Sequence, residues 1–252
     1  RITTVLGIKS NIAEIVSVEN GEITVRCKGD GEFFLRALCK NGTEKYHILT
    51  ALKLTGEGLG AASFNPYELV LGGLHTVQTD NISNGIERGA GFANENSWFG
   101  FENVDFGSIG SDTVTVPIFA NCTTPVKIRF YDGIPGEGGE MIGEFSYHEP
   151  PQWLTYIPNT FKLNKVLKGM HTFVMESDDG YNVQGFVFRK PDKEFGEINA
   201  ADNESVYGDK FTAEPDAVTG IGNNVMLNFG EFDFSEKQPT KIIITGKSHL
   251  PL

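Results

Sequence analysis

The chain has 252 residues, and its 33 Asp and Glu against 21 Lys and Arg give a formal net charge of −12. This acidic excess argues against nucleic-acid binding, which needs clustered Lys and Arg to neutralise phosphates, and against docking on an anionic membrane surface. Hydrophobic residues make up 39% and aromatic residues 11% of the chain, which is enough for a packed core. No apolar run reaches the roughly 18–20 residues that span a bilayer as a helix.

Short runs rich in β-branched and aromatic residues follow one another along the chain, and no segment of helical length has apolar residues at helical spacing. Asn-Gly and Asp-Gly pairs separate several of these runs and favour the positive φ of tight turns. The runs cover residues 22–27, 33–38, 46–54, 113–119, 126–131, 171–175 and 241–245. Many short strands joined by such turns predict an all-β fold, either a sandwich or a barrel.

The three cysteines, Cys27, Cys39 and Cys122, are far apart in the sequence. Their odd number and wide spacing predict neither a disulfide framework nor a zinc site. We expect buried thiols, with one bridge plus a leftover thiol as the alternative. The sequence does not indicate the cellular compartment of the protein.

An internal repeat relates the middle of the chain to its end. Residues 98–107 align with residues 226–235, which lie 128 positions further on, and the same offset aligns residues 114–116 with 242–244. Residues 64–68 align with 198–202 at an offset of 134. A period of about 130 residues is too long for a solenoid repeat and fits a whole β-sandwich domain.

The repeat divides the chain into three parts. Residues 1–62 form a small strand-rich unit, residues 63–191 the first copy of the repeat and residues 195–252 an incomplete second copy. Half a sandwich leaves an unpaired strand edge and a bare apolar face. We therefore expect the chain to be a piece of a longer polypeptide, and the alternative is that its last segment packs against something else.

The first copy resembles a family 6 carbohydrate-binding module, a β-jelly-roll domain. Four stretches carry the resemblance, in the order and spacing of that family. They are Phe92-Ala-Asn-Glu-Asn-Ser-Trp98, Glu149-Pro-Pro-Gln-Trp-Leu-Thr-Tyr156, Leu163-Asn-Lys-Val-Leu-Lys-Gly-Met-His-Thr172 and Gly180-Tyr-Asn-Val-Gln-Gly-Phe-Val-Phe188. The resemblance implies an accessory domain that holds sugar.

The whole layout resembles the C-terminal region of a family 2 glycoside hydrolase of the β-galactosidase type. The phrases at residues 38–42, 84–89, 104–107 and 221–225 carry this resemblance. It implies an immunoglobulin-like sandwich over residues 1–62, followed by the jelly-roll module and its partial second copy. It also implies a catalytic (β/α)8 barrel upstream, so that the partners would be the rest of the parent enzyme and carbohydrate, with galactose-containing sugars among the candidates.

Resemblance to such modules also implies the binding residues. Phe92, Trp153 and Tyr156 would supply flat rings, because a ring covers the patch of C–H groups on a pyranose face. Asn182 would read the hydroxyls, since a buried polar group left unpaired costs roughly 1–3 kcal/mol. Phe92 stands where the family usually has Tyr, and core or rim packing is the alternative for Phe92 and Trp153. Trp98 lies inside a predicted strand, so we expect it in the core.

Family 6 modules often hold a structural calcium ion, and the resemblance places Glu68 at that position. One carboxylate is a poor match to an ion that takes six to eight oxygens, so a solvated Glu is the alternative. We expect no cofactor otherwise.

We expect no catalytic residues in this chain. The carboxylates Glu137, Glu140 and Glu144 surround a glycine-rich hairpin tip, whereas a glycosidase needs two carboxylates held rigidly across a cleft. The predicted function is a non-catalytic accessory region that binds carbohydrate or buttresses the parent enzyme. The alternative is a purely structural or assembly role without sugar binding.

Overall fold

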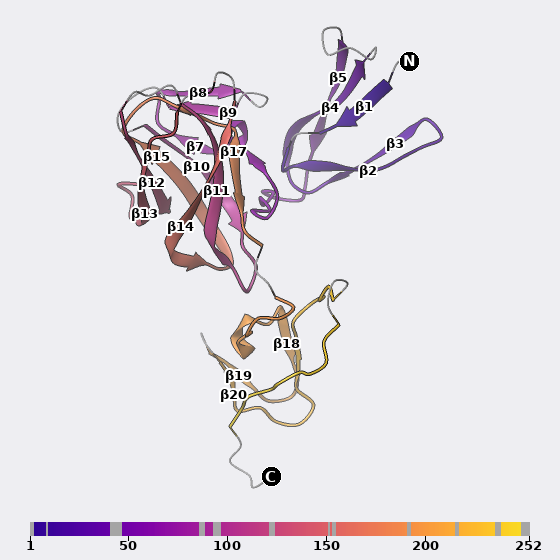
Figure 1. Ribbon diagram of the computed structural model, residues 1–252. Helices are drawn as coiled ribbons and strands as arrows, with labels where there is room; N and C mark the ends of the chain where they lie inside the picture. Colours follow the sequence, from indigo (N-terminus) through magenta and orange to yellow (C-terminus); the bar gives the residue numbers. More distant parts are fainter. Residues whose placement is uncertain are drawn as a thin grey trace. The chain divides into compact units, whose positions relative to one another are not determined.

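The computed structural model covers the whole chain and describes residues 3–8, 10–40, 47–85, 89–92, 97–120, 124–150, 152, 155–190, 193–214, 217–234 and 238–247. The chain divides into two compact units, residues 1–190 and residues 191–252. Strands make up all the regular structure of the described residues apart from two short 3-10 turns, η1 (Gly72–Leu74) and η2 (Ala200–Asp202) (Figure 1). The predicted all-β fold is confirmed.

The first 56 residues form two antiparallel sheets. One has the order β1-β4-β5, from strands β1 (Thr3–Gly7), β4 (Gly31–Lys40) and β5 (His47–Gly56). The other is the hairpin of β2 (Ala13–Glu19) and β3 (Glu22–Cys27). Asn20 and Gly21 turn this hairpin with φ of 52° and 82°, the positive values that the Asn-Gly pair favours.

Among the described residues of positions 1–62, few apolar side chains are buried. Ala13, Phe33 and Ala62 are, whereas Phe34 is 49% and Leu52 58% exposed. The region belongs to the same compact unit as the sandwich that follows it. An immunoglobulin-like domain ending at residue 62 therefore stays a prediction. Cys27 is a free thiol, but it and Cys39 are only partly buried, so the expectation of buried thiols was wrong for both. Cys122 lies outside the described residues.

Residues 64–190 form two sheets. The first has the order β13-β12-β15-β10-β7, and the second has the order β6-β17-β11-β16-β9-β8, with β14 also paired to β11 (Figure 1). All the strand pairings within these two sheets are antiparallel. The strands are β6 (Val70–Leu71), β7 (Val77–Gln78), β8 (Ile82–Gly85), β9 (Gly89–Phe92), β10 (Ser97–Asp105), β11 (Ser111–Phe119), β12 (Val126–Asp132), β13 (Glu140–Tyr147), β14 (Ile157–Leu167), β15 (Met170–Ser177), β16 (Asn182–Val183) and β17 (Gly185–Phe188).

Phenylalanine rings from both sheets meet in one core. Phe101 of β10 packs edge-on against Phe186 of β17 with ring centroids 4.9 Å apart, and Phe173 of β15 lies 5.1 Å from Phe188 of β17. None of these four rings is more than 2% exposed. A strand alternates its side chains between two faces, and β11 follows this rule, with Val114, Val116 and Ile118 in the core. Burying one such ring contributes about 1.5–3 kcal/mol, so the aromatic core holds the two sheets together as a sandwich.

Trp98 does not lie in the core, where the sequence predicted it. It precedes the buried Phe99 on β10, so the alternation of the strand sends it to the outer face, where it is half-buried. The prediction that Trp98 lies in the core was wrong, because it took the apolar run as a whole and not its period of two.

The second unit repeats part of the sandwich at a smaller scale. β18 (Ser205–Tyr207) pairs with β21 (Met226–Asn228), and β19 (Thr212–Ala213) pairs with β20 (Val218–Thr219). Val206 lies opposite Leu227, while Gln78 of β7 lies opposite Phe99 of β10, and both members of the later pair are 128 positions further on. This shared register supports the internal repeat.

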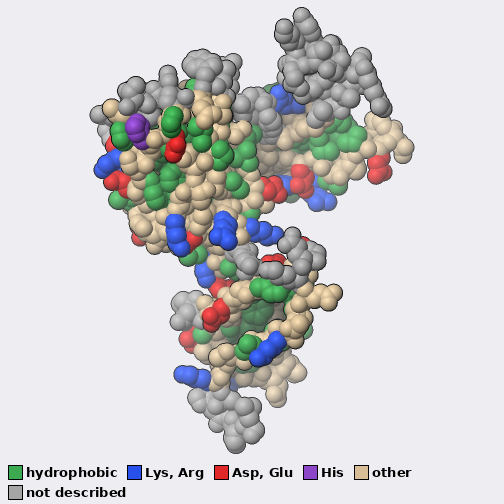
Figure 2. Space-filling view, viewed as in Figure 1, with side chains coloured by type: hydrophobic (Ala, Val, Ile, Leu, Met, Phe, Trp, Pro, Cys, Tyr) green, Lys and Arg blue, Asp and Glu red, His purple; other side chains and the backbone are tan. Residues whose placement is uncertain are grey.

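The predicted strand at residues 241–245 is absent. Ile242, Ile243 and Ile244 have no regular structure and are 85%, 73% and 87% exposed. Their counterparts in the repeat, residues 114–116, belong to β11, which pairs with β14 on one side and with β16 and β17 on the other. The described residues of the second unit contain no counterpart of those partners, and a strand forms only where a ladder can satisfy its backbone. Hydrophobic side chains accordingly reach the surface in several places (Figure 2).

Candidate carbohydrate-binding site

Phe92 belongs to the core and not to the surface. It ends β9, is 4% exposed, and its ring lies 4.9 Å from that of Phe99 and 4.6 Å from that of Tyr181. Its backbone N–H donates to the Tyr181 carbonyl at 2.8 Å. A ring covered in this way cannot stack on a sugar, so the structure supports core packing for Phe92. The missing tyrosine hydroxyl fits this position, since a buried hydroxyl would need a partner.

A row of side chains crosses the second sheet one residue away from Phe92. Asn182 of β16 lies opposite Phe119 of β11 on one side and Gly91 of β9 on the other, and Gly91 lies opposite Ser83 of β8. The ring of Tyr156, just before β14, lies 6.2 Å from that of Phe119. We call Tyr156, Phe119, Asn182, Gly91 and Ser83 the outer row.

The outer row points away from the core. The neighbouring pair in the same ladder, Ile118 and Val183, is 0% exposed and belongs to the core. Directly opposite residues of an antiparallel sheet share a face, and successive residues alternate between faces. Phe119 and Asn182 therefore project from the other face of the sheet, where both are only partly buried.

Gly91 brings two polar groups together. A side-chain carbon at this position would collide with Asn182 Oδ1 and with Ser83 Oγ, so both groups lean over the glycine. Ser83 Oγ also donates to the Gly91 carbonyl at 3.4 Å. An amide and a hydroxyl thus lie close together beside the rings, which is a polar pair that can face the hydroxyls of a ligand.

The two rings of the outer row stand at 74° to each other. Burial raises the pKa of the Tyr156 hydroxyl above its ordinary value, so the group stays neutral and can donate a hydrogen bond. The Tyr156 ring is partly buried, which leaves some of its surface to solvent. Trp153 lies outside the described residues, and its role as a stacking ring stays a prediction.

The turn Ser177–Gly180 carries the chain from the first sheet to Asn182 in the second. Ser177 Oγ donates to the Asp179 carbonyl at 2.6 Å and accepts from the Asp179 N–H at 3.1 Å. The Gly180 N–H donates to Asp179 Oδ1 at 2.6 Å. Tyr181 follows, 4% exposed, and its ring packs on Phe92. The residue before Asn182 is therefore anchored in the core.

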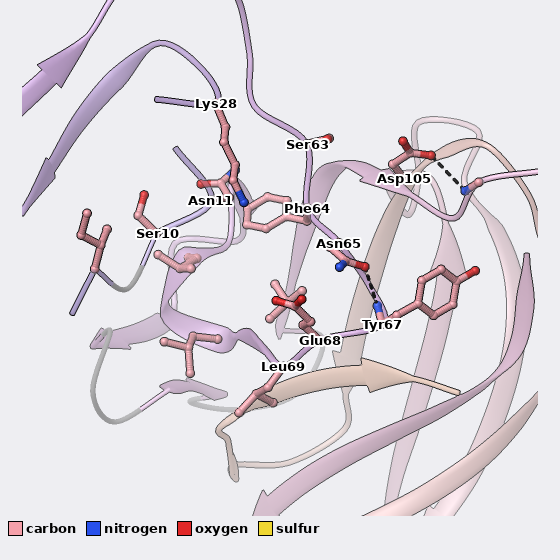
Figure 3. A pocket seen from close by; sticks show the side chains of 15 residues that line it. Ser10, Asn11, Lys28, Ser63, Phe64, Asn65, Tyr67, Glu68, Leu69 and Asp105 are labelled. Atoms are coloured by element: carbon pink, nitrogen blue, oxygen red, sulfur yellow. Dashed lines mark hydrogen bonds between the residues drawn. The ribbon is translucent and has the colours of Figure 1, made fainter. Parts of the chain in front are cut away.

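Glu68 lines a cavity of about 610 Å³ in the first compact unit (Figure 3). Two other oxygen-bearing side chains of this cavity already accept hydrogen bonds, Asn65 from the Tyr67 N–H and Asp105 from the Gly107 N–H. No three carboxylate, imidazole or thiol groups among the described residues gather into a metal-binding set. Calcium beside Glu68 stays a prediction.

Two of the three carboxylates near the glycine-rich hairpin lie on a strand. Glu140 and Glu144 belong to β13, and Glu137 alone lies in the turn before it. Lys165 Nζ pairs with Glu140 at 2.7 Å, and Arg129 Nε pairs with Glu144 at 2.8 Å. The two strand carboxylates thus take part in ion pairs.

Tyr156 and Asn182 of the outer row are residues that the sequence predicted for binding, whereas Phe119, Gly91 and Ser83 were not among the predicted residues. The outer row depends on which strands are neighbours, and that information is not local in the sequence. The alternation of Gly89-Ala-Gly-Phe92 was the one available signal, because a buried Phe92 places Gly91 on the opposite face.

No protein-family model matches this chain, and no curated protein matches it. Among the described residues, no helix is long and apolar enough to cross a bilayer.

Several solved structures are similar to part of the chain. A family 6 carbohydrate-binding module from Clostridium stercorarium, in complex with cellobiose, has 18% identity and a TM-score of 0.45, over 52% of this chain and 98% of that one. A β-1,3-glucan-binding family 6 module from Bacillus halodurans has 20% identity and a TM-score of 0.43, over 50% and 98%. A family 6 module from Clostridium cellulolyticum, in complex with xylose, has 23% identity and a TM-score of 0.40, over 50% and 99%.

Proposed function

We propose that this chain is a non-catalytic carbohydrate-binding region and that its sandwich holds sugar at the outer row. The observation that carries the proposal is the cross-strand register that sets two aromatic rings beside an amide and a hydroxyl on the outer face of one sheet. The resemblance of residues 92–188 to family 6 modules supports it independently.

The chemistry of the outer row suits a pyranose. Tyr156 and Phe119 offer ring surface to the C–H groups of a sugar face, and each aromatic contact contributes about 0.5–1.5 kcal/mol beyond the buried area. Asn182 can both donate and accept, and Ser83 can do the same, so the pair can read the directions of two neighbouring hydroxyls. After the cost of immobilising the ligand, such a small site gives a dissociation constant on the order of 0.1–1 mM.

The substrate class proposed is a β-linked oligosaccharide. Cellobiose, xylose and β-1,3-glucan are the ligands named for the similar modules. The resemblance to β-galactosidases adds galactose-containing sugars to the candidate ligands. The same resemblance supports the proposal that the chain is an accessory region of a glycoside hydrolase. Trp153, three residues before Tyr156, would add a third ring in this proposal.

Isothermal titration calorimetry of the whole chain with a sugar panel tests the function. The panel contains cellobiose, xylobiose, laminaribiose and a β-galacto-oligosaccharide. We expect heat with at least one of them, and Tyr156→Ala or Phe119→Ala should weaken its binding about tenfold or more. Phe34→Ala removes an exposed ring far from the outer row in sequence and should leave binding unchanged. The site is rejected if Phe34→Ala weakens binding as much as Phe119→Ala does.

An assembly role without sugar binding is the second candidate. The exposure of Ile242, Ile243 and Ile244 favours it, because apolar residues in such a run are typical of surfaces that become covered. Sedimentation of the same protein separates the two functions. Self-association without heat from any sugar supports assembly, and a monomer that binds sugar contradicts it.

A further inference from the structure

Arg129 of β12 is the centre of the densest group of charges in the described part of the sandwich. Its side chain is only 17% exposed and contacts three carboxylates. Nε lies 2.8 Å from Glu144 Oε2, and Nη1 lies 2.9 Å from Glu176 Oε1 and 2.6 Å from Asp178 Oδ1. We call these four residues the Arg129 cluster.

The three carboxylates of the cluster come from different parts of the fold. Glu144 and Glu176 lie directly opposite Arg129 on the flanking strands β13 and β15, which the sheet ladder already holds in place. Asp178 lies beyond the last residue of β15, in the turn Ser177–Gly180. The shortest of the three contacts therefore reaches out of the sheet and into the turn.

The contact to Asp178 is a short hydrogen bond between charged groups. The hydrogen bonds that Arg129 donates to Asp178, and then to Glu144 and Glu176, outweigh the effect of burial and raise the pKa of Arg129 above its ordinary value. The guanidinium is charged at any pH of interest. A second bond holds the same residue, since the Asp178 N–H donates to the Lys127 carbonyl of β12 at 3.2 Å. Both the side chain and the backbone of Asp178 are thus fixed to β12.

The turn Ser177–Gly180 connects Asp178, which is held by β12, to Asn182 of the outer row. Ser177 and Asp179 are joined by two hydrogen bonds, and Gly180 is held by Asp179, so the turn is internally braced. Tyr181 is anchored in the core, and Asn182 follows it directly. Only three residues separate Asp178 from Asn182, so the contact to Arg129 and the amide of the outer row lie at the two ends of one short, hydrogen-bonded turn.

We propose that Arg129 is a positioning residue for Asn182, acting through Asp178 and the turn Ser177–Gly180. It sets the direction of the amide from the opposite sheet without touching the ligand. The consequence for sugar affinity rests on the proposed function, whereas the consequence for the turn does not.

The first arm of the test needs no sugar. Amide hydrogen exchange is measured for residues 178–182 in the full chain, with Arg129→Met against Lys127→Met as the matched control. Lys127 lies on the same strand and pairs with Glu144 at 2.9 Å. We expect Arg129→Met to speed exchange at Gly180 and Asn182 roughly tenfold and Lys127→Met to leave it unchanged. Equal exchange in wild type and Arg129→Met overturns the proposal.

The second arm is a double-mutant cycle on sugar affinity, with the panel sugar that binds wild type best. Arg129→Met should weaken binding about 3- to 10-fold in the wild-type background and have no further effect in Asn182→Ala. A merely structural role would lower affinity by the same factor in both backgrounds, and that result overturns the proposal. Asp178→Ala, which removes only the turn contact, should reproduce the effect of Arg129→Met and serves if Arg129→Met does not fold.

The two arms also separate this proposal from the proposed function. Faster exchange in Arg129→Met in a protein that binds no sugar supports the positioning of the turn and rejects the function. Sugar binding with unchanged exchange supports the function and rejects the positioning role.

Discussion

At the residue scale, the site depends on which side chains a strand sends to each face. Phe92 and Gly91 are neighbours in β9, yet one belongs to the core and the other to the outer row. The resemblance to family 6 modules drew attention to this stretch and to Asn182, but it could not show that Phe92 is covered by Phe99 and Tyr181. Burial of that ring depends on partners from two other strands.

Gly91→Ala tests the packing of the outer row. The new carbon would collide with the side chains of both Asn182 and Ser83, so we expect the amide to move and sugar affinity to fall about tenfold. Gly7→Ala is the matched control, since nothing lies within 4 Å of that position in β1. Calorimetric titration measures both variants, and equal affinity in Gly91→Ala and wild type would contradict the described packing.

Asp132 predicts a specific dependence of stability on pH. Burial raises the pKa of this carboxyl, but hydrogen bonds from Lys165 and His171, each 2.8 Å long, outweigh it and bring the pKa below its ordinary value. A depressed carboxyl pKa stabilises the fold above the unfolded pKa of about 3.9, and this contribution is lost as the pH falls through the folded pKa. Glu140 shares Lys165 with Asp132.

The measurement is the free energy of unfolding in urea between pH 7 and pH 2.5. Wild type should exceed Asp132→Asn at neutral pH, and the difference should shrink below about pH 4. Glu137→Gln, in the exposed turn before β13, is the control, and its unfolding free energy should depend on pH in the same way as that of wild type. If the difference in unfolding free energy between wild type and Asp132→Asn instead grows as the pH falls, the pKa of Asp132 is not lowered in the folded protein.

At the element scale, strands could be predicted where the local pattern and the partner strands agree. The run at residues 22–27 is β3, and those at 113–119 and 126–131 lie within β11 and β12. Residues 241–245 show the limit of the pattern. Their three isoleucines have high strand propensity, but the second unit offers them no ladder, and propensity cannot replace missing hydrogen-bond partners.

Two alanine substitutions compare a strand in the core with this unpaired segment. Phe173 of β15 is 0% exposed, and its ring lies 4.9 Å from that of Phe186 and 5.6 Å from that of Phe130. Phe173→Ala should cost about 3–5 kcal/mol of unfolding free energy, whereas Ile243→Ala should stay within about 0.5 kcal/mol. Urea unfolding followed by far-ultraviolet circular dichroism measures both variants, since this signal reports on the strands of both compact units. A large loss in Ile243→Ala would show that this segment packs in solution.

At the scale of the whole molecule, the two compact units differ in how much they bury. The sandwich has a continuous aromatic core, whereas Val218 is the one buried apolar side chain among the described residues of the second unit. Two-stranded sheets without such a core are marginal in water. The sequence repeat predicted two related modules, and we expect the second to be less stable because its described residues build no comparable core.

Hydrogen exchange should show this difference directly. Amides of β11, which is paired on both sides, should exchange only on global opening, whereas those of β18 and β21 should exchange at least a hundredfold faster. Mass spectrometry of peptides from the exchanged protein resolves the two regions. Equal protection of both would mean that the second unit is held by contacts beyond its two short sheets.

The central claim is that the outer row binds carbohydrate. The most direct measurement is a nuclear magnetic resonance titration of the amide-labelled chain with the panel sugar that gives the largest calorimetric heat. We predict saturable shifts at Phe119, Gly91 and Asn182, and their loss in Asn182→Ala with the fold unchanged. Shifts confined to other strands, or the same shifts in Asn182→Ala, would contradict the account.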